Sequence, residues 1–272
     1  MSVSETKRLL RELRIIPNKL LGQNFIVEPS IFPKLTNYAS LGKTEVVLDA
    51  GAGFGFLTRF LAKRCENVLA VEKDPRVAMV LRENLKGLAN VTVIEGDVLK
   101  TAVPNFNKVV SIPPYQISSR LLLWLFDRNF CCAVLVLQKE FAERLVAAVG
   151  SEEYGWLTVA TCQSTEVQLL DSVPNFMFYP PPEVDSIIVR LTPWKTSPFE
   201  VKDKEFFRRM VRWLFTQRNK KLSNALSPFI KSAFKINKED AQKTASTFSF
   251  GEKRVRELKP ETFGELSNVL IR

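Results

Sequence analysis

Short apolar runs alternate with helical segments over the first half of the chain, and this alternation constrains the fold more than any other feature. The runs are EVVLDAG (45–51), NVLAVEKD (67–74), VTVIEGD (91–97), KVVSIPP (108–114) and CAVLVLQKE (132–140). Between them, 56–64 and 75–87 are predicted helices, the second opened by Pro75 at its first position. Strands that are apolar almost throughout are buried on both faces, so the pattern predicts an α/β fold with a parallel sheet covered by helices. Ligands of such sheets lie at the carboxyl ends of the strands.

The pattern changes near residue 197, where we place a domain boundary. The segment 172–194 is rich in loops, and Pro180 to Pro182 predict an extended surface stretch before the strand VDSIIVRL. From about Ser197 onward only helices are predicted, and one of them gathers apolar residues on one face: Phe206, Phe207, Met210, Val211 and Leu214. The sequence thus predicts an α/β domain over 1–196 and a small all-helical domain over 197–272.

Positive charge is concentrated in the predicted helical domain. The chain has a net charge of +10, and residues 195–272 hold 18 Lys and Arg against 9 Asp and Glu. This asymmetry favours a polyanionic partner met by the C-terminal part, although a well-solvated basic surface is the alternative. The candidates for phosphate contacts are Arg208, Arg209, Arg212, Arg218, Lys220 and Lys221.

The chain contains no histidine, which excludes Ser-His-Asp and Cys-His nucleophilic catalysis and removes the commonest transition-metal ligand. Its four cysteines form no CxxC pair, so we expect neither a disulfide framework nor a metal site. No apolar run approaches the roughly 18 residues of a membrane span, and the charged N-terminus lacks the core of a signal peptide. A cytoplasmic protein, with no membrane or metal partner, is expected.

LDAGAGFGFLT (48–58) is a glycine-rich turn between a strand and a helix. Gly51, Gly53 and Gly55 let a ligand approach the backbone, although a tight structural turn is the alternative. Glu72 ends the next strand, where a carboxylate can accept hydrogen bonds from ribose hydroxyls, and Asp97 ends the third, within reach of the amine of a base. Since nothing here suits a triphosphate, this nucleoside cradle predicts S-adenosylmethionine.

VVSIPPYQISS (109–119) ends a strand with two prolines and Tyr115. The prolines remove two backbone donors, so the turn leaves carbonyl oxygens without partners in the fold. Such oxygens can accept hydrogen bonds from an amine, and an aromatic side chain beside them can stack on a flipped base.

Taken together, these motifs resemble those of KsgA-type small-subunit rRNA adenine N6-dimethyltransferases. LGQNFIVEP (21–29), LDAGAGFGFLT, AVEKD, EGD, PPYQISS, LQKE, YGWLTV (154–159), FYPPPEVDS (178–186) and QRNKKLSNAL (217–226) follow the family's order over nearly the whole chain. The resemblance implies a Rossmann-like class I methyltransferase domain with a small helical domain. It also implies S-adenosylmethionine as cofactor, a ribosomal particle as substrate, and transfer of two methyl groups to each of two adjacent adenines in the 3′-terminal rRNA hairpin.

The resemblance also implies site residues. Tyr115 and Phe178 would sandwich the target adenine, next to Ile112, Pro113 and Pro114. Cofactor contacts would come from Gln23, Asn24, Ile26, Gly51, Gly53, Glu72, Lys73, Asp97, Val98 and Ile112. Adenine N6 is a poor nucleophile because its lone pair is delocalised into the ring. Acceptors for its N–H bonds would localise that lone pair, so positioning and electrostatics would dominate catalysis.

The chain departs from the family at Ile112, where asparagine is usual. Isoleucine offers no acceptor for the amine, but the carbonyls of Ile112 and Pro113 still do. Losing one such contact is expected to raise the activation free energy of methyl transfer by about 2.7–4 kcal/mol if it resembles the loss of an oxyanion-hole donor. Full dimethylation, single methylation, and a non-catalytic ribosome-assembly factor are all left open by the sequence.

A DNA adenine methyltransferase is a further alternative, but its target-recognition region would be larger than the residues after Ser197. The sequence fixes neither the number of methyl groups, nor the assembly intermediate that is the substrate, nor the oligomeric state, for which we expect a monomer.

Overall fold

The computed structural model describes residues 3–12 and 24–271, which form two compact units. The sheet unit comprises residues up to Ala142 together with Val167–Pro193. The helical unit comprises Glu143–Glu166 and Trp194 onward, so it includes a segment that the sequence analysis gave to the first domain. The reason is burial: Tyr154 is fully buried in the core of the helical unit, and its hydroxyl donates to the Leu258 carbonyl over 2.8 Å.

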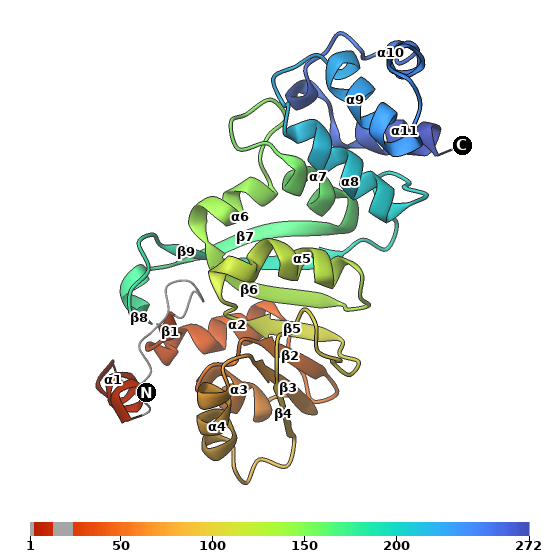
Figure 1. Ribbon diagram of the computed structural model, residues 1–272. Coiled ribbons are helices and arrows are strands. Elements are labelled where there is room, and N and C mark those ends of the chain that lie inside the picture. Colours follow the sequence, from red (N-terminus) through yellow and green to blue (C-terminus); the bar gives the residue numbers. More distant parts are fainter. Residues whose placement is uncertain (1–2, 13–23, 272) are drawn as a thin grey trace. The chain divides into compact units, whose positions relative to one another are not determined.

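The sheet unit is built on a seven-stranded sheet in the order β4-β3-β2-β5-β6-β9-β7 (Figure 1). Neighbours pair in parallel from β4 to β6, and β9 runs antiparallel to β6. The bounds are β2 (Val46–Ala50), β3 (Asn67–Glu72), β4 (Val91–Glu95), β5 (Lys108–Ser111), β6 (Cys132–Gln138), β7 (Thr165–Val173) and β9 (Ser186–Pro193). The expected α/β class and the five predicted runs are confirmed.

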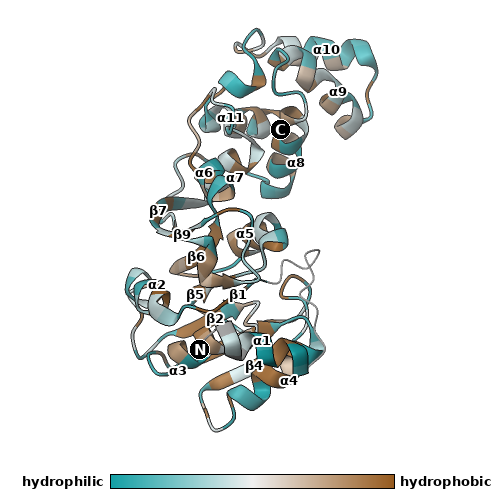
Figure 2. Ribbon diagram, turned by 90° about the vertical axis from the view of Figure 1, so that its left-hand side faces the viewer, coloured by the Kyte–Doolittle hydropathy of each residue, from teal (hydrophilic) through white to brown (hydrophobic). Residues whose placement is uncertain are grey.

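The predicted parallel arrangement holds from β4 to β6, whereas β9 runs antiparallel to β6, and the edge strand β7 was missed. The sequence of β7, TEVQLLDSV, has exposed polar residues interrupting its apolar ones, as befits a strand at the end of the sheet. It therefore lacks the continuous apolar run that marks the central strands, which are coloured as hydrophobic in Figure 2.

Helices α2 (Phe32–Tyr38), α3 (Phe56–Ala62) and α4 (Pro75–Asn84) cover one face of the sheet. Val68 and Ala70, two positions apart on β3, point to that face, where Val68 lies in the core of α2 and α3 and Ala70 packs with Leu81 of α4. Helix α5 (Ser118–Phe126) buries Leu121, Leu122 and Leu125 completely.

Two short N-terminal elements attach to this framework. Helix α1 (Val3–Glu12) places Leu10 in a cluster with Phe54 and Val77. Strand β1 (Phe25–Ile26) pairs antiparallel with β8 (Phe178–Tyr179), so that Ile26 lies opposite Phe178. The pairing brings two segments that are about 150 residues apart in the chain beside each other. Gln23, a predicted cofactor contact, lies outside the described residues.

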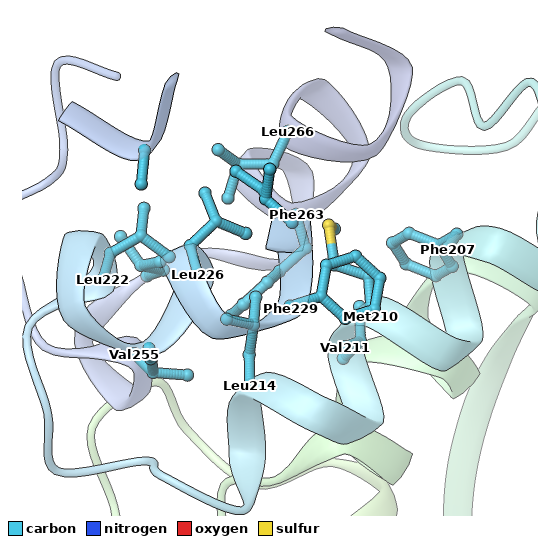
Figure 3. Packing of buried hydrophobic residues seen from close by; sticks show 14 of the residues in the cluster. Phe207, Met210, Val211, Leu214, Leu222, Leu226, Phe229, Val255, Phe263 and Leu266 are labelled. Atoms are coloured by element: carbon cyan, nitrogen blue, oxygen red, sulfur yellow. The ribbon is translucent and has the colours of Figure 1, made fainter. Parts of the chain in front are cut away.

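The helical unit has a continuous core of its own (Figure 3). It contains α7 (Trp156–Ser164), α8 (Lys204–Phe215), α9 (Leu222–Phe234), α10 (Lys238–Ser246) and α11 (Pro260–Leu270), and α6 (Lys139–Leu145) crosses its boundary. The predicted apolar face of α8 is confirmed, since its five residues are all buried. Asp203 caps α8 by accepting the Phe206 N–H over 2.9 Å. Within the described part of the chain, no helix is long and apolar enough to cross a membrane.

Candidate active site

A cavity of about 630 Å³ opens at the carboxyl ends of the parallel strands in the sheet unit. Its walls come from β1, from the turns after β2, β3, β4 and β5, and from the start of α5. Most of the predicted cofactor-binding residues lie there: Asn24, Ile26, Gly51, Gly53, Glu72, Lys73, Asp97, Val98 and Ile112. This volume is typical of small-molecule and cofactor sites.

The glycine turn after β2 leaves no room for a side chain at Gly51. This residue has a φ of +81°, and a Cβ atom there would lie 2.5 Å from Cδ of Pro114. Gly55, with a φ of +83°, is the N-cap of α3 and packs closely on Leu81. The turn is therefore held against the proline turn after β5, and its bare backbone faces the cavity.

Glu72 at the end of β3 is tied to the glycine turn. One carboxylate oxygen accepts the Gly53 N–H over 2.9 Å, and the other accepts the Asp74 N–H over 2.9 Å. Burial raises the pKa of Glu72, although these backbone hydrogen bonds oppose the shift. Each oxygen has a second lone pair, so the fixed carboxylate can still accept from two neighbouring hydroxyls of a ribose.

Asp97 follows β4 and faces the same cavity. Its carboxylate accepts the Leu99 N–H over 3.1 Å and pairs with Nζ of Lys73 over 3.1 Å. Burial works to raise the pKa of Asp97, but these hydrogen bonds and the charges of Lys73 and Lys100 outweigh it and lower the pKa. An ionised acceptor is thereby held one strand away from Glu72, where it can receive the amine of an adenine base.

Asp49 in β2 lines the cavity as well and is not among the predicted site residues. It is buried, accepts the hydroxyl of Thr58 over 2.7 Å, and burial raises its pKa to about 7. The signal in the sequence was an acidic residue inside the apolar run EVVLDAG, two positions before the first glycine of the turn. A carboxyl buried there favours a cationic ligand group, such as a sulfonium or an ammonium.

The proline turn after β5 contributes Ile112 and Pro114 to the cavity, whereas Pro113 is buried outside its lining. The neighbouring Ser111 is fully committed to the sheet: its hydroxyl donates to the Ala50 carbonyl over 2.7 Å and accepts the Ala50 N–H over 3.1 Å. Ser111 is therefore no substitute for the missing asparagine, and the Pro114 carbonyl already accepts the Ile117 N–H over 3.1 Å.

Tyr115 and Phe178 lie next to each other, as their predicted common role requires. Their ring centroids are 6.3 Å apart with planes inclined by 66°, and Phe178 is only 2% exposed. The Tyr115 hydroxyl is hydrogen-bonded to Ser186 Oγ over 2.8 Å. The rings meet edge to face and lie outside the cavity lining, so an adenine can enter between them only after they separate. The sandwich stays a prediction.

The predicted RNA-binding residues of the helical unit have mixed surroundings. Arg218 donates to the carbonyls of Glu152 and Ser151, and Arg212 lies over the ring of Trp156 at 4.4 Å. Lys221 is paired with Glu252, whereas Arg209, Arg212 and Lys220 are exposed on the surface. Arg218 therefore braces a loop of its own unit, and the role of the set in RNA binding stays a prediction.

The order of the strands and the position of the cavity define a class of protein. Numbered along the chain without β1 and β8, the sheet has the order 3-2-1-4-5-7-6 with one antiparallel strand, which is that of class I methyltransferases. The glycine turn and the two acids lie at the strand ends where these enzymes hold S-adenosylmethionine.

Comparison with known proteins then gives the family. The family model for ribosomal RNA adenine dimethylase matches residues 17–270, and the chain belongs to this family. It is 37% identical over 251 residues to the probable ribosomal RNA small subunit methyltransferase A of Methanosarcina mazei, covering 92% of this chain and 91% of that protein. It is 38% identical over 267 residues to the protein of the same description from Thermococcus kodakarensis, covering 96% and 93%.

Two solved structures have a similar fold. A dimethyladenosine transferase from Plasmodium falciparum superposes with a TM-score of 0.74 at 29% identity, over 88% of this chain and 94% of that one. The 23S rRNA methyltransferase ErmE superposes with a TM-score of 0.63 at 28% identity, over 92% and 100%. The similarity to these two enzymes therefore extends over both units of the chain.

Proposed function

We propose that this chain transfers methyl groups from S-adenosylmethionine to N6 of two adjacent adenines in the 3′-terminal hairpin of small-subunit rRNA, two groups to each adenine. The observation that carries the proposal is a single cavity that joins the glycine turn, Glu72 and the proline turn in a member of the rRNA adenine dimethylase family. The comparisons give no support to the alternative of a non-catalytic or singly methylating assembly factor.

The residues of the cavity fit the cofactor. Glu72 would hold the ribose hydroxyls, Asp97 and Val98 the adenine, and the backbone of the glycine turn would lie along the methionine part, with Asn24 and Ile26 on the β1 side. Lys73 keeps Asp97 ionised and in place. The bound cofactor supplies a methyl group on a positively charged sulfur, and the buried carboxyl of Asp49 favours that charge.

The proline turn would orient the target adenine. The carbonyl oxygens of Ile112 and Pro113 accept the two N–H bonds of the amine, which localises the lone pair of N6 and points it at the methyl group. Tyr115 and Phe178 would stack on the flipped base, each contact contributing about 1–3 kcal/mol. The amine loses a proton to solvent after transfer, so no side chain with a pKa near 7 has to act as a general base.

We propose a monomer in the cytoplasm whose basic helical unit contacts the rRNA of a ribosomal particle, with Arg208, Arg209, Arg212, Lys220 and Lys221 near phosphates. The exposed cations of α8 and of the segment after it support this. Binding through them weakens with salt, with a log–log slope that grows with the number of phosphates engaged.

The test is methyl transfer from labelled S-adenosylmethionine to unmethylated small ribosomal subunits, followed by mass spectrometry of the digested nucleosides. N6,N6-dimethyladenosine in the 3′-terminal hairpin is the expected product. Monomethyladenosine alone would restrict the proposal to single transfer. An unmodified particle that nevertheless binds both the protein and the cofactor would overturn it.

A further inference from the structure

Arg120 is a cavity-lining residue that neither the sequence analysis nor the proposed mechanism uses. It is exposed in the first turn of α5, on the same wall of the cavity as Gln116 and Ile117. Gln116 belongs to the short 3-10 helix Tyr115–Ile117 that leads directly into α5, so consecutive elements of the chain bring both residues to the cavity. Arg120 thus follows shortly after Tyr115 in the chain and lines the cavity that the proline turn also lines.

The three cations of the cavity wall differ in their partners. Lys73 pairs with Asp97 over 3.1 Å, and Arg76 forms a two-pronged pair with Asp74 over 2.8 and 3.1 Å. Arg120, by contrast, makes no ion pair, side-chain hydrogen bond or ring contact with any of residues 3–12 and 24–271. A guanidinium with five donors therefore lines the cavity, exposed to solvent and without an acceptor among the described residues.

The local sequence gives Arg120 no structural role. It is the only charged residue of α5, whose other members are serine, leucine, tryptophan and phenylalanine. A cation in the first turn of a helix is disfavoured by the helix dipole, by about 0.3–1 kcal/mol at an exposed position. The neighbouring Arg128, in contrast, lies over the Trp124 ring at 3.5 Å and donates to the Trp124 carbonyl. The positive charge of Arg120 does not stabilise its own helix, which is consistent with a role in binding an anionic ligand.

We propose that Arg120 binds a backbone phosphate of the RNA at the entrance of the cavity, next to the adenine that is methylated. The inference rests on the proposed function, because it takes the substrate to be RNA. A planar guanidinium matches a phosphate through two parallel hydrogen bonds. When a base turns into the site, its phosphates stay at the solvent side, which is where an exposed arginine is found. Arg120 is therefore a positioning residue: it holds the nucleotide while the proline turn orients the amine.

The carboxylate of the cofactor is the other oxyanion that Arg120 can meet, and the experiment separates the two. We would compare Arg120→Ala, Arg120→Lys and the wild type in single-turnover methylation of unmethylated small subunits at several salt concentrations. Binding of S-adenosylhomocysteine to each free protein would be measured by calorimetry. Lys86→Ala is the matched control, since it also removes one positive charge from the sheet unit, and Lys86 is a highly exposed residue outside the cavity.

For Arg120→Ala we expect a half-saturating subunit concentration about 10-fold higher, a maximal rate within about twofold, and a log–log salt slope reduced by about 0.7 to 0.9. Arg120→Lys should recover part of the affinity, and Lys86→Ala should match the wild type. Alanine is as good a helix former as arginine, so the melting temperature should not fall.

An unchanged half-saturating concentration and salt slope would overturn the proposal. So would weaker binding of S-adenosylhomocysteine to Arg120→Ala, because this would assign the arginine to the cofactor. If the wild type methylates nothing, the proposed function fails, while the salt slope of particle binding still decides whether Arg120 contacts RNA. The two proposals can therefore fail separately.

Discussion

The backbone N–H of Gly53 donates to Oε2 of Glu72 over 2.9 Å, and this bond joins the turn after β2 to the end of β3. Because the other oxygen of Glu72 is held by the Asp74 N–H, the carboxylate cannot rotate without breaking one of the two bonds. The acid and the glycine turn therefore form one rigid unit, and a ligand that contacts both meets a site that is already in place.

Replacing Glu72 should abolish most cofactor binding. Glu72→Ala removes the acceptor for the ribose hydroxyls and leaves the Gly53 N–H without its partner, so we expect a loss of about 1.5–3 kcal/mol, or roughly 10- to 150-fold in Kd. Glu72→Gln keeps the shape and one acceptor oxygen and should lose less. Calorimetric titration with S-adenosylhomocysteine measures both. Equal losses in the two variants would contradict a role for the second oxygen.

The pH dependence of binding follows from the same carboxylate. Burial raises the pKa of Glu72, and only the ionised form accepts from two hydroxyls. As the pH falls through this raised pKa, cofactor affinity should therefore decrease at a higher pH than an ordinary glutamate would cause. In Glu72→Gln this part of the pH dependence should disappear. An identical pH profile in the two proteins would show that another group is responsible.

Gly51 should tolerate no side chain. Gly51→Ala would place a methyl group 2.5 Å from Pro114 at a φ of +81°, so both the clash and the backbone strain act. Gly87 is the matched control, because it has a φ of +85° and nothing within 4 Å of the added methyl group. We expect Gly87→Ala to lose about 1 kcal/mol of unfolding free energy and Gly51→Ala to lose about 1–3 kcal/mol more. Urea unfolding measures the difference, and similar losses would contradict tight packing of the two turns.

Asp49 should make the unfolding free energy depend on pH between the pKa of this carboxyl in the unfolded chain and its higher pKa in the folded protein. Burial raises its pKa from 3.8 to about 7, so the folded state retains a proton that the unfolded chain has already released in this range. Its contribution to stability is thus fully present below about pH 4 and is lost as the pH rises to about 7. Asp49→Asn keeps an acceptor for Thr58 but does not titrate. Its unfolding free energy, measured in urea at pH 5.5 and 7.5, should fall less with rising pH than that of the wild type.

The central strands and the acids at their ends could be predicted because they are local signals. Continuous apolar runs mark β2, β3 and β6. Most predicted cofactor residues lie at the end of a parallel strand or just after it, so locating the strand also locates the residue. Strand β7 was missed because polar residues interrupt its apolar ones, so it shows no continuous apolar run. The assignment of α7 to the helical unit was missed because it depends on long-range packing. Val159 of α7 and the preceding Tyr154 are buried in the core of that unit, and only the folded chain shows this.

The same distinction holds within the site. Asp49 looks in the sequence like one polar residue in an apolar strand, and its burial against Thr58 depends on α3. Arg120 has no motif of its own, and its lack of partners is visible only when the surroundings are assembled. The edge-to-face contact of Tyr115 and Phe178 likewise joins residues that lie far apart in the chain, and no local pattern of the sequence encodes it.

Tyr115 should act through its ring rather than its hydroxyl. Tyr115→Phe removes the bond to Ser186 but retains the aromatic face, so the methylation rate should stay within about 10-fold of the wild type, since a hydrogen bond contributes a net of about 0.5–1.5 kcal/mol. Tyr115→Ala should weaken stacking of the base by about 1–3 kcal/mol. Single-turnover methylation of small subunits measures both. A larger loss in Tyr115→Phe than in Tyr115→Ala would overturn this division of roles.

Ile112 should matter more for stability than for catalysis. It lines the cavity but also packs against the apolar core formed by α2, α3 and the sheet. Ile112→Asn would restore the side-chain acceptor that the family usually has, but it would also place an amide against that core. We expect this variant to lose about 1–3 kcal/mol of unfolding free energy, because a partly buried polar group then lacks partners.

The effect of Ile112→Asn on the chemical step should be modest if, as the proposed mechanism has it, backbone carbonyls of the same turn accept the amine. We expect the single-turnover rate to change by less than about 10-fold, or 1.4 kcal/mol, with N6,N6-dimethyladenosine as the product of both proteins. Ile112→Val is the control, since it preserves an apolar side chain without an acceptor. If Ile112→Asn alone raises the rate by several orders of magnitude, the carbonyls do not replace the missing amide, and the turn of the wild type holds its substrate poorly.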